Sequence, residues 1–116
     1  MLISTGCSLM PKLEYSPVAL DKLGAIYRYI AEELLSPAGA ENTVRSIREK
    51  LRVLKQTPFL GAPISSRYAE VLERFQDVRV LLCGNYLALY RYNEKTVKIL
   101  CIYHTKEDYV SHLFKT

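Results

Sequence analysis

Apolar residues recur every three or four positions in two neighbouring stretches of the chain, a spacing that places them along one face of an α-helix. They are Leu23, Ile26, Tyr27, Ile30 and Leu34 in the first stretch, and Ala40, Val44, Ile47, Leu51 and Leu54 in the second. Ser16-Pro17 precedes the first stretch and Ser36-Pro37 the second, as at helix starts, where serine caps and proline needs no N–H partner. Thr57-Pro58 ends the second helix. Because the link at 35–37 is short, the sequence predicts an antiparallel helical hairpin.

From Val78 onward the pattern changes to runs of β-branched and aromatic residues, which favour strands. We predict strands over 78–83, 86–92 and 96–104, with a turn signal at Gly84-Asn85 between the first two. The short stretch KLEY at 12–15 is a further candidate, and it would join the same sheet because four residues do not form a stable strand alone.

Both faces of these predicted strands carry apolar side chains. In the central strand, alternation separates two sets: Tyr86, Ala88, Tyr90 and Tyr92 on one side, Leu87, Leu89 and Arg91 on the other. In the next strand, it places Leu100 and Ile102 opposite Ile99, Cys101 and Tyr103. Helices must cover one of these faces. The predicted fold class is therefore α+β, with an N-terminal helical hairpin packed on a small antiparallel sheet.

The 116 residues are the size of one domain, which we assign to 11–116. Residues 1–10 are expected to be a disordered arm or a start-site extension, since a second methionine, Met10, directly precedes PKLEYSP. We predict a short turn of helix at 69–75, and a last helix or edge strand in the closing segment. No apolar run reaches the roughly 18 residues that a membrane-spanning helix needs, so no such helix is expected.

Composition excludes several kinds of chemistry. The net charge of +4 is compatible with an anionic partner, and it is also common among domains that have none. The three cysteines form no C-x-x-C pair, so we expect no zinc site, no disulfide framework and a reducing compartment. Cys83 and Cys101 fit the strands as small apolar residues. Phosphate-loop, dinucleotide and zinc-protease motifs are absent from the sequence, and no cofactor or metal is expected.

The C-terminal half gathers groups that could cleave RNA without a metal. That reaction needs a base for the 2′-hydroxyl, an acid for the leaving oxygen and cations for the phosphate. His104 ends the last predicted strand, and Lys106, Glu107 and Tyr109 follow it closely. A structural role is equally open, because a histidine at a strand end often serves only as a hydrogen-bonding residue. The arginines of the strands could likewise be surface residues.

The order of elements and several short stretches resemble the RelE/ParE superfamily of type II toxins over residues 11–112. The stretches are IYRYIAEEL in the first helix, TPFLG after the second, GNYLALYRY in the hairpin, and CIYH at the end of the last strand. The resemblance implies a small cytoplasmic toxin encoded with an antitoxin whose flexible tail wraps and neutralises it. It also implies one of two activities: metal-independent cleavage of mRNA on the ribosome, or non-enzymatic inhibition of DNA gyrase.

The resemblance also assigns roles to residues. CIYH matches the ending of nuclease members, whose histidine is catalytic, and this points to His104. With the basic residues of the predicted sheet added, the nuclease hypothesis has His104, Arg79, Lys106 and Tyr109 as its catalytic set and Arg91, Lys98 and Arg67 as its nucleic-acid contacts. One position departs from the nuclease pattern: Leu87 stands where nuclease members carry an arginine. Loss of such a cation typically removes about 2–4 kcal/mol of transition-state stabilisation.

Two targets therefore remain open. CIYH and the basic sheet favour the mRNA endoribonuclease, which we take as the first hypothesis, with Glu107 or Tyr109 assisting His104. Leu87 and the long helical hairpin favour the gyrase inhibitor. A third interpretation is a degenerate toxin that only binds its antitoxin.

Overall fold

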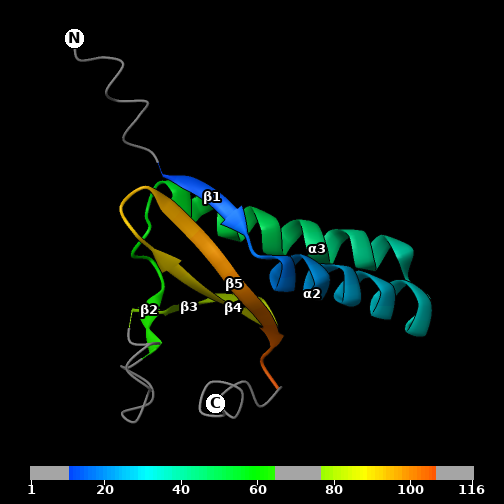
Figure 1. The fold of residues 1–116 in the computed structure, drawn as a ribbon. Helices are drawn as coiled ribbons and strands as arrows, with labels where there is room; N and C mark the ends of the chain where they lie inside the picture. The colour runs from blue at the N-terminus through cyan, green and yellow to red at the C-terminus, as the bar shows by residue number, and fades with distance from the viewer. Residues whose placement is uncertain (1–10, 65–76, 107–116) are drawn as a thin grey trace.

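A helical hairpin lies on one face of a five-stranded sheet in the computed structural model, which describes residues 11–64 and 77–106 (Figure 1). The N-terminal elements are β1 (Lys12–Tyr15), α2 (Pro17–Arg28), a π-helical turn η1 (Tyr29–Glu33), α3 (Pro37–Arg52) and a 3₁₀ turn η2 (Val53–Lys55). The sheet is completed by β2 (Ala62–Pro63), β3 (Arg79–Cys83), β4 (Tyr86–Tyr92) and β5 (Thr96–His104). None of the helices in these described ranges is long and apolar enough to cross a membrane.

The predicted α+β fold is confirmed, and the sheet differs from the prediction in two ways. Its strand order is β1-β5-β4-β3-β2, and the neighbours among β2 to β5 are antiparallel. β1 joins the sheet as expected but pairs parallel with β5, so the sheet is mixed rather than antiparallel. The long intervening chain, with both helices, makes this parallel pairing possible. The two-residue strand β2 was not predicted because so short a segment carries no alternation.

Serine caps start both helices, as predicted. The Ser36 hydroxyl oxygen accepts a hydrogen bond from the Gly39 N–H at 3.1 Å. The Ser16 oxygen accepts from the Ala19 N–H at 3.0 Å, and its hydroxyl donates to the Leu100 carbonyl at 2.7 Å. Ser16 therefore both starts α2 and attaches that start to β5. The regular part of α3 ends earlier than predicted, at Arg52, where the 3₁₀ turn takes over.

The core lies between the hairpin and the sheet. Its buried members include Leu23, Ile47, Leu51, Leu54, Leu81, Tyr90, Val97, Ile99 and Ile102. A second buried cluster occupies the opposite face of the sheet: Ile64, Val78, Val80, Leu87, Leu89, Cys101 and Tyr103. The prediction that both faces of the central strand are apolar is thus confirmed.

A β-bulge in β5 reverses part of the predicted alternation. Leu89 pairs with Cys101 whereas its neighbour Tyr90 pairs with Ile99, so Leu100 has no partner on β4. An extra residue shifts the following side chains to the other face. Ile99 consequently shares the helix-covered core with Ile102, and its predicted grouping with Cys101 was wrong.

The connection between the helices contains a strained leucine, which gives a first testable prediction. Leu35 has φ 54°, a left-handed conformation, and the residue is 82% exposed. The Ser36 N–H donates back to the Ile30 carbonyl at 3.0 Å, as in helix ends that usually carry glycine at this position. Because glycine adopts this φ without a Cβ clash, Leu35→Gly should stabilise the fold by about 1 kcal/mol. The urea midpoint should rise for Leu35→Gly. It should fall for Leu34→Gly, because Leu34 has an ordinary φ of −95°. Equal changes of the midpoint in the two variants would show that Leu35 is not strained.

Candidate functional site

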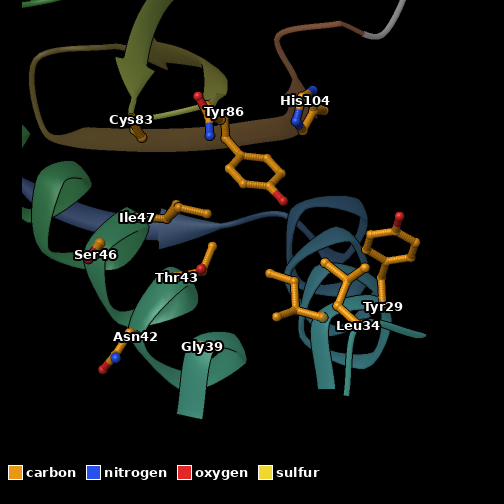
Figure 2. Close-up of a pocket in the computed structure, with 13 residues that line it drawn as sticks. Tyr29, Leu34, Gly39, Asn42, Thr43, Ser46, Ile47, Cys83, Tyr86 and His104 are labelled. Carbon is orange, nitrogen blue, oxygen red and sulfur yellow. The ribbon is translucent and has the colours of Figure 1, made fainter. Parts of the chain in front are cut away.

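A cavity of about 670 Å³ lies between the turn end of the helical hairpin and the β3–β4 turn (Figure 2). The hairpin contributes Tyr29 and Leu34 to its lining, and the sheet contributes Cys83, Tyr86 and His104. The Tyr86 side chain projects from the sheet toward the helices (Figure 2). The helix α3 adds the uncharged polar residues Asn42, Thr43 and Ser46. The cavity is therefore mainly apolar, with neutral polar groups and a single imidazole on its wall.

Local contacts hold His104 in one orientation. Its Nδ1 accepts a hydrogen bond from the Lys106 backbone N–H at 3.1 Å, so the neutral ring carries its proton on Nε2. The ring packs edge-to-face against Tyr86, with centroids 5.1 Å apart and an interplanar angle of 80°. Tyr86 and His104 are paired across β4 and β5, which sets this contact. His104 and Lys106, two of the predicted catalytic residues, are thus adjacent at the end of β5.

The other reactive groups near the cavity do not add nucleophilic or metal chemistry. Burial raises the pKa of the Cys83 thiol to about 11, so the thiol stays protonated at neutral pH and is a poor nucleophile. Over residues 11–64 and 77–106, no group of three His, Cys, Asp or Glu side chains is placed to hold a metal ion.

Arg79, a predicted catalytic residue, lies at the other end of the sheet and contacts the loop after the helices. It is opposite Tyr90 in the β3–β4 ladder. Its Nη1 donates to the carbonyl oxygens of Phe59 and Gly61, and the guanidinium lies 4.8 Å from the centre of the Phe59 ring. This arginine therefore has a structural role in fixing that loop.

Arg91 and Lys98, two predicted nucleic-acid contacts, face each other across β4 and β5. Arg91 Nε forms an ion pair with Asp77 at 3.1 Å, and Lys98 is exposed. The β4 register separates both residues from Tyr86 and His104 by about 17 Å, and Arg79 from them by about 14 Å, at 3.4 Å per residue.

The predicted site residues are therefore divided between two ends of the sheet. The remaining ones, Arg67 and Tyr109, and the assisting Glu107, lie outside the described residues. Leu87, which stands where nuclease members carry an arginine, is 3% exposed and belongs to the core on the face away from the helices.

Sequence reasoning missed the polar lining of the cavity. The neutral polar residues of α3, Asn42, Thr43 and Ser46, all precede Arg48, and from Arg48 onward every polar residue of the helix is charged. This change along one helix was the available signal.

Comparison with known proteins agrees with this fold. The model of a family described as the ParE toxin of the type II toxin–antitoxin system parDE matches residues 13–109. Among solved structures, the chain is similar to the chromosomal ParDE system from P. aeruginosa, with 27% identity and a TM-score of 0.66 over 84% of this chain and 98% of that one. It is also similar to the toxin–antitoxin complex RelBE2 from Mycobacterium tuberculosis, with 18% identity and a TM-score of 0.49 over 82% and 98%. A search of curated proteins found no match. The family match spans most of the chain, and the protein belongs to the ParE toxin family of type II toxin–antitoxin systems.

Proposed function

We propose that this protein is the toxin of a type II toxin–antitoxin module and that it arrests growth by binding DNA gyrase rather than by cutting mRNA. The observation that carries the proposal is the sheet register. His104 is paired with Tyr86 at one end of β4, whereas Arg79 and Arg91 lie toward the other end.

RNA cleavage requires the acid/base and the cation to act on the same phosphate. A general acid or base must come within about 3 Å of the proton that it transfers, and stabilising cations must be equally close. A separation of about 14 Å between the strand positions of His104 and Arg79 is too large for one phosphate, given the rise of a strand. Arg79 is also engaged with the carbonyls of Phe59 and Gly61, and contacting a phosphate near His104 would break both hydrogen bonds.

The family assignment supports the binding function and a partner. ParE-like members of the superfamily inhibit gyrase without a nuclease site, and the similar solved structure is a ParDE system. A cognate antitoxin that neutralises the toxin in the cytoplasm follows from the same assignment.

The nuclease remains the second candidate because one observation favours it. His104 and Lys106 are adjacent at the end of β5, and both are at least partly exposed. An imidazole and an ammonium group at one strand end could still contact RNA without the arginines.

Replacing His104 separates the two functions. We expect His104→Ala to leave growth arrest unchanged, since a gyrase inhibitor needs no proton transfer. The protein would be induced in cells while mRNA 5′ ends are mapped and plasmid supercoiling is followed, and purified protein would be added to a gyrase supercoiling assay. Thr105→Ala, at the neighbouring exposed position, is the matched control.

The expected pattern is intact mRNA, relaxed plasmid and inhibited gyrase for the wild type and both variants. Codon-phased mRNA cuts that disappear in His104→Ala would overturn the proposal and establish the nuclease.

A further inference from the structure

The loop that joins η2 to β2 presents two apolar side chains to solvent. It has the sequence Thr57-Pro58-Phe59-Leu60-Gly61 and is called here the 57–61 loop. Phe59 is 63% exposed and Leu60 is 49% exposed. Scattered exposed apolar residues are ordinary, but adjacent ones on a structured loop are typical of an interaction site.

Side chains from the sheet fix the backbone of this loop. The Tyr90 hydroxyl donates to the Pro58 carbonyl at 2.8 Å and accepts from the Gly61 N–H at 2.9 Å. Arg79 donates to the carbonyls of Phe59 and Gly61. Two residues of adjacent strands therefore bind the carbonyls on both sides of Leu60 and hold the loop in one conformation.

The exposed aromatic ring is also held in place. Phe59 packs edge-to-face on Tyr92, with centroids 5.2 Å apart, while the Arg79 guanidinium lies over the ring. An aromatic side chain that is ordered before binding loses little conformational entropy in a complex, and such residues often dominate binding energy. The 57–61 loop thus combines exposure with preorganisation.

The charges around the loop indicate the chemistry of its partner. Arg79 contacts Phe59 directly, and the chain as a whole carries a net charge of +4. Asp77, the carboxylate nearest to Arg79 in the sequence, is paired with Arg91. An arginine beside an exposed apolar side chain, on a chain of net positive charge, fits an apolar depression bordered by carboxylates.

We propose that the 57–61 loop is a contact through which the toxin engages its protein target, with Phe59 and Leu60 entering an apolar depression bordered by acidic residues. This inference rests on the proposed function, because it requires a target that is bound rather than cleaved. The loop lies at the far end of β4 from the cavity at His104, so the two surfaces can be tested separately.

Phe59→Ala and Leu60→Ser test the loop, and Leu20→Ser on α2 is the matched control because Leu20 is also 49% exposed. We expect both loop variants to be at least about tenfold weaker in growth arrest and in inhibition of gyrase supercoiling, as for central interface residues. Leu20→Ser should behave as wild type. Binding of the antitoxin, measured by calorimetry, should be unchanged in all three variants.

Growth arrest by the loop variants at wild-type strength would overturn the inference. Loss of antitoxin binding with growth arrest retained would also overturn it, because the loop would then be an antitoxin surface. If Phe59→Ala lowers the urea midpoint, instability alone could weaken its growth arrest. Growth arrest by Leu60→Ser and Phe59→Leu then decides whether the loop contacts the target. A wild-type protein that arrests growth but leaves gyrase active would refute the gyrase proposal alone, since the contrast between Leu60→Ser and Leu20→Ser in growth arrest would still test the loop.

Discussion

Gly61→Ala should destabilise the protein by about 3 kcal/mol or more, although it adds only one methyl group. Gly61 is buried, and a Cβ at this position would lie 2.7 Å from the Val80 carbonyl oxygen. It would also lie 2.8 Å from both Cε1 and Oη of Tyr90. Atoms do not pack at such distances, so the loop or the strand must move.

The movement has a predictable energetic cost. Overpacking a rigid site costs about 1–3 kcal/mol. Displacing the loop also breaks the hydrogen bond from the Gly61 N–H to the Tyr90 hydroxyl, and each buried group left without a partner costs about 1–3 kcal/mol. Neither Val80 nor Tyr90 can yield easily, because both are buried.

Gly24→Ala is the matched control for this prediction. Gly24 lies within α2, and the nearest atom to an added Cβ is the flexible end of Arg28 at 3.4 Å. Alanine is favoured over glycine inside a helix, so this variant should be stabilised by about 0.5–1 kcal/mol. Urea unfolding measures both free energies of unfolding. A Gly61→Ala midpoint at or above that of wild type would disprove the close approach of loop and sheet.

Local signals in the sequence predicted most elements of the fold. Ser16 and Ser36 cap the helices because capping depends on a few adjacent residues. The strands β4 and β5 begin and end at the predicted residues, since alternation and turn residues are also local. Helix starts and strand bounds could therefore be predicted, because each depends on residues within its own segment.

Non-local pairing set the features that were not predicted. The bulge at Leu100 has no glycine or proline to mark it, and the Ser16 hydroxyl, distant in sequence, hydrogen-bonds to its carbonyl. The parallel direction of β1 likewise depends on its pairing with β5, which is distant in the sequence. Neither feature leaves a pattern in its own segment.

The division of the predicted site residues between two ends of the sheet has a related origin. Arg79 and Arg91 were selected by residue type, as cations suited to phosphate. Their partners, the 57–61 loop and Asp77, become neighbours only through the strand register. Sequence could therefore name the cations but could not show that they lie far from His104.

Tyr90→Phe removes a single oxygen and should still cost about 2–4 kcal/mol of stability. The Tyr90 side chain is fully buried, and its hydroxyl bridges the Gly61 N–H and the Pro58 carbonyl. Phenylalanine keeps the ring but leaves both backbone groups without their partner. Burial raises the pKa of Tyr90, so the hydroxyl stays protonated and keeps donating to Pro58 at neutral pH.

Tyr92→Phe is the control, because the Tyr92 hydroxyl donates at the surface to the Glu94 carbonyl at 3.3 Å. Its loss should change stability by less than about 0.5 kcal/mol. Equal urea midpoints for the Tyr90 and Tyr92 variants would contradict the bridging role. Because Gly61→Ala breaks the same contact, its combination with Tyr90→Phe should cost less than the sum of the two single variants. Such non-additivity would show that one contact, between Tyr90 and the 57–61 loop, is responsible for both effects.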